Sequence, residues 1–124
     1  MQRQAFILSI GSDTELLGLR SQVLRAEGYA VQQESDLGRA LIAFKDGDFD
    51  LIVICHSVPE KERLRVVVNA KRIKPSTLVL LVTKDTYGEA ARLADASIHS
   101  LEGPEVLLSC VAGLLKRNDE RQPS

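Results

Sequence analysis

The chain has 124 residues, of which 44% are hydrophobic and 27% are charged, and its net charge is -1. This length predicts one domain, which we place at residues 1–118, followed by a polar tail at residues 119–124. The small net charge excludes a global field that attracts nucleic acid or an anionic membrane, and no apolar segment approaches the roughly 20 residues that cross a bilayer.

The first two elements are a strand and a helix. Residues 5–10, AFILSI, have the length and composition of a strand. The next segment has apolar side chains near helical spacing, with Thr14 or Asp13 as N-cap and Gly28 as the stop. Its apolar residues are Leu16, Leu19, Val23 and Leu24.

A weaker strand, a second helix and a strong strand follow. Residues 30–35, AVQQES, are apolar on one side only, as expected at the edge of a sheet. Asp36 is expected to cap a helix that ends at the turn around Gly47. The apolar face of that helix comprises Leu37, Ala40, Leu41 and Phe44. Residues 50–55, DLIVIC, predict the most buried strand.

The second half of the chain continues the alternation. Residues 61–74 contain three consecutive valines, which favour a strand, but the spacing of Leu64, Val67 and Ile73 and the stop at Pro75 favour a helix. The remaining predicted elements are a strand at 77–83, a helix at 86–95, a short strand at 97–99 and a helix at 104–117.

Five strands alternating with five helices predict an α/β fold with a parallel sheet, because the central strands are apolar on both faces. The expected arrangement is flavodoxin-like and doubly wound, with strand order 2-1-3-4-5. Ligands in such sheets bind at the carboxyl ends of strands 1 and 3. The residues expected at that edge are Gly11, Ser12, Asp13, Cys55, His56 and Ser57.

Several scaffold marks give the sequence a specific resemblance. They are Gly28-Tyr29, Ala40-Leu41, Asp50-Leu51, Pro59, Thr83 and Pro104-Glu105. Their order and spacing resemble those of response-regulator receiver domains (CheY-like) along nearly the whole chain. The resemblance implies a receiver-like protein of two-component or phosphorelay signal transduction.

The chemical marks of that family are missing. The resemblance places Cys55 at the phosphoacceptor aspartate, and Gly11 and Ser12 at the acidic pair that holds a divalent metal. Ser100 replaces the lysine that would pair with the phosphoryl oxygens, while Thr83 is retained. Forming an aspartyl phosphate needs a carboxylate nucleophile, a hard cation with oxygen ligands and a cationic side chain. We therefore expect no metal, no other cofactor and no phosphorylation.

Cys55 and its neighbours allow other interpretations. A thiolate activated by His56 would suggest an enzyme, but adjacent strand residues point to opposite faces, and a small buried thiol that fills the pocket is favoured. A turn at Gly11-Ser12-Asp13 could cradle phosphate, although it has one glycine and no P-loop lysine. We read both cysteines, Cys55 and Cys110, as reduced residues of a cytoplasmic protein.

A protein-binding surface is the remaining functional candidate. The resemblance places it on the fourth helix, fifth strand and fifth helix, at residues 86–117. The last helix has more apolar residues than a one-sided helix requires, and the candidate contact residues are Val106, Leu107, Val111 and Leu114. A well-buried helix is the alternative. The basic residues within 61–74 are read as a solvated face rather than a nucleic-acid site.

The sequence thus predicts a stand-alone receiver-like protein, not an enzyme, that acts through contact with a signalling protein or a second copy of itself. One alternative is a small flavodoxin-like ligand-binding protein or enzyme that uses a pocket at Ser12, Cys55, Ser57 and Thr83. Another is an active receiver with Asp13 or Ser57 as an unusual acceptor.

Overall fold

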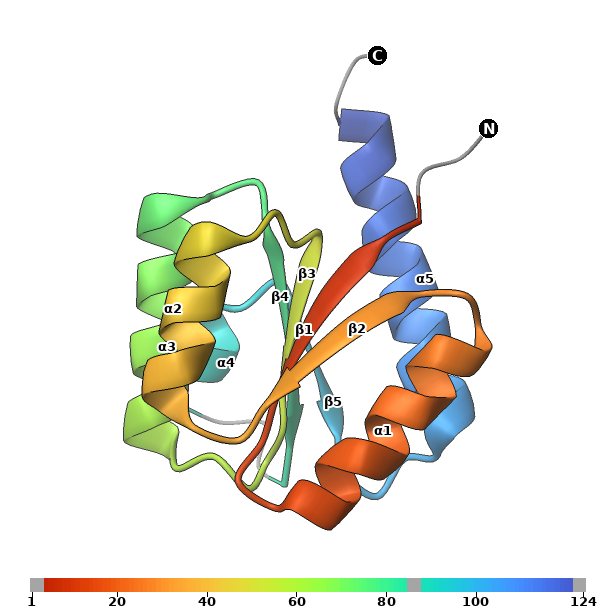
Figure 1. Cartoon of the computed structure of the whole chain (residues 1–124), viewed down its shortest axis with the longest axis horizontal. Coiled ribbons are helices and arrows are strands. Elements are labelled where there is room, and N and C mark those ends of the chain that lie inside the picture. Colours follow the sequence, from red (N-terminus) through yellow and green to blue (C-terminus); the bar gives the residue numbers. More distant parts are fainter. Residues whose placement is uncertain (1–3, 85–87, 122–124) are drawn as a thin grey trace.

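The computed structural model describes residues 4–84 and 88–121. Within these residues, five strands and five helices alternate along the chain (Figure 1). The strands are β1 (Phe6–Ile10), β2 (Ala30–Glu34), β3 (Leu51–Ile54), β4 (Leu78–Thr83) and β5 (Ala96–His99). The helices are α1 (Thr14–Ala26), α2 (Leu37–Asp46), α3 (Glu60–Ile73), α4 (Glu89–Leu93) and α5 (Pro104–Arg121).

The strands form one parallel sheet in the order β2-β1-β3-β4-β5. Helices α1 and α5 cover one face of this sheet, and α2, α3 and α4 cover the other (Figure 1). Every residue of β3 and β4 is buried, whereas β2 at the edge is only partly buried. The predicted fold class and strand order are confirmed.

Two apolar layers hold the sheet between its helices. Alternate residues of β1 and β3 serve opposite layers, so that Ile7 packs toward α1 and α5 while Leu8 packs toward α2 and α3. In the first layer Leu24 of α1 and Leu114 of α5 meet the sheet, and in the second layer Phe44 of α2 is among the buried residues. Both faces of the central strands are therefore buried, as their unbroken apolar runs predict.

The helix ends follow local side-chain chemistry. The Asp13 carboxylate caps α1 by accepting a hydrogen bond from the Leu16 backbone N–H at 3.1 Å, which selects Asp13 over Thr14 as the N-cap. Asp36 caps α2 in the same way, at 3.0 Å from the Arg39 backbone nitrogen. Past the end of α1, Gly28 has a φ of 97°, a left-handed conformation that favours glycine.

Several element boundaries differ from the sequence predictions by one residue, and α4, α5 and the buried face of α1 differ by more. Helix α4 is confined to Glu89–Leu93, and part of its expected range, residues 85–87, lies outside the described residues. Helix α5 continues to Arg121, so residues 119–121 of the expected tail are helical, and residues 122–124 lie outside the described residues. Strand β5 begins at Ala96. The buried residues of α1 are Leu17, Ser21 and Leu24, and only Leu24 of these was predicted.

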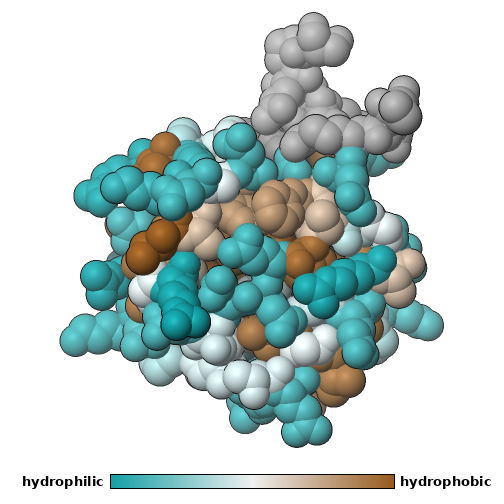
Figure 2. Space-filling view, in the orientation of Figure 1, coloured by the Kyte–Doolittle hydropathy of each residue, from teal (hydrophilic) through white to brown (hydrophobic). Residues whose placement is uncertain are grey.

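Among the described residues, no helix is long and apolar enough to span a membrane. Polar side chains cover most of the face shown in Figure 2, and apolar side chains reach that face only in separate areas.

Candidate functional site

Gly11 and Cys55 lie against each other at the carboxyl ends of β1 and β3. The Cys55 backbone N–H donates to the Ile10 carbonyl at 2.8 Å, which fixes the two strand ends side by side. A Cβ atom placed on Gly11 would lie 3.2 Å from the Cys55 Cβ and 3.4 Å from its sulfur. The thiol therefore fills the space beside Gly11, as predicted for a small buried residue, and an acidic side chain at position 11 would crowd it.

The turn at Gly11-Ser12-Asp13 is closed by a side chain from the loop after β3. The Ser57 hydroxyl accepts hydrogen bonds from the backbone N–H groups of Ser12 at 2.9 Å and Asp13 at 3.1 Å. These are two of the amide donors that a phosphate cradle would need. Because they are already satisfied within the chain, the structure does not favour a phosphate cradle at this turn.

Cys55 is not a poised nucleophile. Its side chain is buried, with 1% of the residue exposed, and burial raises the pKa of the thiol, while the charge of Arg20 and a hydrogen bond from it act in the opposite direction. Burial, followed by the positive charges of Arg20 and Lys84, lowers the pKa of His56. Both groups are therefore held neutral near pH 7, and neither gains the charge that a thiolate–imidazolium pair requires.

The other sequence-predicted residues meet at the same edge of the sheet. Thr83 is buried at the end of β4, and its hydroxyl oxygen accepts a hydrogen bond from Nη1 of Arg63 at 3.4 Å. The Ser100 backbone N–H donates to the Thr83 carbonyl at 2.8 Å, which joins the loop after β5 to the end of β4. The structure thus brings Gly11, Ser12, Cys55, Thr83 and Ser100 to one edge, as the topology predicts.

Two arginines enter this region that the sequence reasoning missed. Arg63 of α3 pairs with the Glu60 carboxylate at 2.8 Å and reaches Thr83 from one face of the sheet. Arg20 of α1 approaches Cys55 from the other face. A sequence signal for Arg20 existed, because it lies at helical spacing between Leu16 and Val23 within an apolar stripe.

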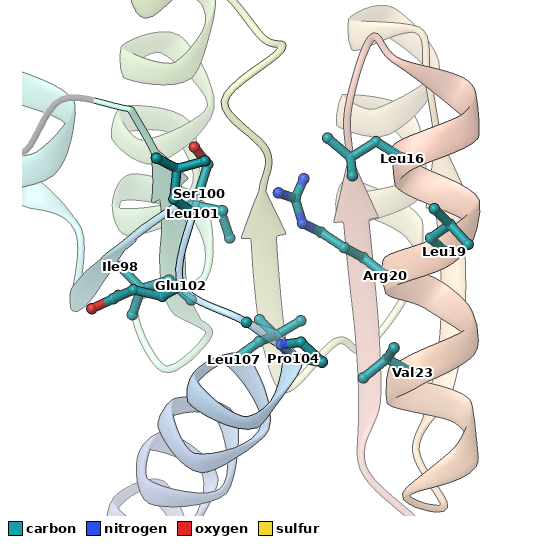
Figure 3. Close-up of a pocket in the computed structure, with 12 residues that line it drawn as sticks. Leu16, Leu19, Arg20, Val23, Ile98, Ser100, Leu101, Glu102, Pro104 and Leu107 are labelled. Atoms are coloured by element: carbon teal, nitrogen blue, oxygen red, sulfur yellow. The ribbon is translucent and has the colours of Figure 1, made fainter.

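Arg20 also lines a groove between α1 and the segment that joins β5 to α5. The groove holds about 400 Å³. Its walls are mainly apolar, with Leu16 and Val23 on α1 and Leu101 and Leu107 opposite them. In Figure 3 the Arg20 guanidinium points across the groove toward Ser100.

The candidate contact residues on α5 are mostly core residues, which corrects the sequence prediction. Leu107, Val111 and Leu114 are buried in the layer between α5 and the sheet. Only Val106 is exposed, at 39%. The surplus of apolar residues on this helix arises because it crosses the sheet beside α1 and needs a broad buried face, so these three leucine and valine side chains cannot be direct contacts with a partner.

Comparison with known proteins shows which solved structures share this fold. No protein-family model matches the chain, and no curated protein sequence matches it. Solved structures similar to it include a CheY-like response regulator receiver domain protein from Methanospirillum hungatei JF-1, with a TM-score of 0.88 and 24% identity over 97% of this chain and 100% of that one. The chain has the fold of a CheY-like receiver domain.

Two further receiver structures support the assignment of the fold. The signal receiver domain of an HD domain-containing protein from Pseudomonas fluorescens Pf-5 has a TM-score of 0.85 and 18% identity, over 95% of this chain and 99% of that one. The response regulator protein TrrA from Thermotoga maritima, in complex with Mg²⁺ and BeF, has a TM-score of 0.81 and 21% identity over 90% of this chain and 99% of that one.

The residues at the carboxyl ends of the strands, an edge of the sheet that we call the receiver edge, do not fit a magnesium ion. Mg²⁺ prefers oxygen ligands that include carboxylates, whereas Gly11 and Ser12 supply none and the Asp13 carboxylate caps α1. Within residues 4–84 and 88–121, no three side chains of His, Cys, Asp or Glu gather as a metal site would require. The positive charge of Arg20 beside Cys55 further opposes a bound cation.

Proposed function

We propose that this chain is a receiver-like signalling protein that is not phosphorylated on an aspartate, catalyses no reaction and acts by contact with another protein. The observation that carries the proposal is the close packing of Cys55 against Gly11, at the positions where the receiver resemblance expects a carboxylate acceptor and an acidic metal ligand. A neutral buried thiol cannot take the place of either group in phosphoryl transfer.

The charges around this edge support the same proposal. A transferring phosphoryl group is stabilised by a bound cation that bridges its oxygens. Here the space is occupied by the Cys55 thiol and approached by Arg20. The alternative acceptors Asp13 and Ser57 are engaged, since Asp13 caps α1 and the Ser57 hydroxyl binds two backbone N–H groups.

The phosphorylation part is tested by incubating the protein with Mg²⁺ and acetyl phosphate and measuring its intact mass. We expect no phosphoryl adduct on the native chain, whereas a receiver domain with an acceptor aspartate acquires one under the same conditions. A stoichiometric adduct on the native chain would contradict the proposal. Peptide mapping would then decide between Asp13 and Ser57.

The contact part is tested first with a second copy of the chain. Val106 is the exposed member of the predicted α5 contact set, and Val68 of α3 is a matched control because it is 45% exposed on another helix. We expect a concentration-dependent dimer in sedimentation experiments, weakened by Val106→Glu and retained in Val68→Glu. A monomer at all concentrations, or equal effects of the two variants, would argue against self-association through α5.

A further inference from the structure

Two guanidinium groups and one imidazole at the receiver edge carry buried nitrogen atoms that have no hydrogen-bond partner among the described residues. They are Nη1 of Arg20, Nε of Arg63 and Nδ1 of His56. Buried polar atoms in folded proteins nearly always have a partner, and a charged donor left without one is unfavourable. Among the three, Nη1 of Arg20 is a charged donor on the α1 side of the sheet, and it indicates that an acceptor is missing there.

The nearby carboxylates do not supply that acceptor to Arg20. The Glu102 carboxylate, which belongs to the same groove, accepts a hydrogen bond from the His99 backbone N–H at 3.1 Å. Its oxygen atoms point away from Arg20 in Figure 3. The Asp13 carboxylate caps α1.

The Glu60 carboxylate forms an ion pair with Arg63 rather than with Arg20. Its carboxylate binds Arg63 at 2.8 Å and also accepts from the Ala90 backbone N–H at 3.3 Å. Within the part of the chain that the structure describes, Arg20 therefore has no ion pair, whereas Arg63 has one.

The balance of charge at this edge is positive. Arg20, Arg63 and Lys84 all act on His56, and Asp13 is the one acidic group among the described residues that acts on it in the opposite direction. Like charges gathered in a partly buried place repel one another, and an anion bound between them would remove that repulsion. A receiver edge that holds a cation would require the reverse sign.

We propose that Arg20, with the Ser100 hydroxyl across the groove, binds a small tetrahedral oxyanion noncovalently and without a metal. Arginine presents several N–H donors in a planar fork that suits phosphate oxygens, and a hydroxyl adds a further donor. The groove of about 400 Å³ is large enough for inorganic phosphate or for a small phosphomonoester.

This inference goes beyond the proposed function and does not depend on it. It concerns reversible binding, in which no covalent bond forms or breaks, and the site uses Arg20 of α1 rather than a residue at the acceptor position. A protein that takes up phosphate here and gives no phosphoryl adduct would satisfy both proposals. The intact-mass measurement tests phosphorylation and the phosphate titration tests reversible binding, so the failure of one proposal can be told from the failure of the other.

The test is a titration followed by ¹H–¹⁵N NMR in a buffer that contains EDTA. The ionic strength is held constant with sodium chloride, and a titration with sodium chloride alone is the control. Inorganic phosphate is added in one series and glycerol 3-phosphate in another. We expect saturable shifts that are largest at Arg20 and Ser100. Tighter binding of glycerol 3-phosphate would identify a phosphomonoester as the ligand, and tighter binding of phosphate would identify the free ion. Shifts that do not saturate, or that chloride reproduces, would overturn the proposal.

Two arginine variants test whether Arg20 itself binds the anion. Arg20→Gln should weaken phosphate binding about ten- to a hundred-fold, the range expected for hydrogen bonds to a charged group. Arg39→Gln removes the same charge from an exposed position on α2 and should leave binding unchanged. Equal affinity of the native chain and Arg20→Gln would refute the role of Arg20. If Arg20→Gln does not fold, the location of the shifts in the native chain decides the question.

Discussion

Replacing Leu114 by alanine tests whether the apolar side chains of α5 are core or contact surface. Leu114 is 2% exposed and packs in the layer between α5, α1 and the sheet. Leucine-to-alanine changes at such positions cost about 2–5 kcal/mol, because the lost transfer free energy adds to that of the cavity left behind. Alanine is a good helix former, so the helix itself is not weakened. We take about 3 kcal/mol as the expected loss of unfolding free energy.

The corresponding shift in melting temperature follows from the size of the chain. For 124 residues, the unfolding entropy is about 0.26 kcal/mol/K, so a loss of about 3 kcal/mol lowers the Tm by about 11 °C. Val106→Ala, at the exposed position on the same helix, should change the free energy by no more than about 0.5 kcal/mol and the Tm by about 2 °C. Circular dichroism melts of the three proteins measure both shifts. Comparable shifts for Leu114→Ala and Val106→Ala would refute the burial argument.

Three further changes have defined outcomes. Because burial raises the pKa of the Cys55 thiol, its modification by iodoacetamide at pH 7 should be slow in the native protein and fast in denaturant, as read by peptide mapping; rapid native labelling would contradict this. Gly28→Ala should destabilise the protein by about 1 kcal/mol in urea titrations, since alanine disfavours a φ of 97°. The folded-state pKa of His56 lies below its unfolded value of about 6.5, so the unfolded chain binds the proton more readily and stability falls as the pH drops below about 6.5. His56→Gln should flatten that dependence, and an unchanged slope would exclude His56 as its source.

The strand pattern made the fold predictable. β3 and β4 are unbroken apolar runs because both of their faces meet helices, and β2 is mixed because it lies at an edge. The parallel order then brings the ends of β1 and β3 together, which is why Gly11 and Cys55 could be placed at one site from the sequence.

The buried face of α1 was not predictable from hydrophobicity. Leu16, Leu19 and Val23 have helical spacing, but Leu17 and Leu24 do as well, and the stripe that joins these two includes a serine. Ser21 can be buried because its hydroxyl donates to the Leu17 carbonyl at 2.9 Å within the helix. A polar residue with its own internal partner thus hides the core face in the sequence.

The arginines of the site were missed for a related reason. Arg20 and Arg63 lie on amphipathic helices, where basic side chains are usually solvated. The sequence does not show in which direction a guanidinium group points, and so it did not reveal the contact of Arg63 with Thr83. The α5 leucines were misassigned because the number of apolar residues on a helix does not reveal how wide a surface it covers.

The close approach of Gly11 and Cys55 also limits how this chain could acquire aspartyl-phosphate chemistry by mutation. An aspartate at position 11 alone would crowd the sulfur, since even its Cβ would lie 3.2 Å from the Cys55 Cβ. An aspartate at position 55 alone would bury a carboxylate with no metal ligand beside it. An aspartate at either position alone therefore leaves the site without one of the groups that phosphoryl transfer needs, so a working phosphorylation site requires changes at both of these neighbouring positions.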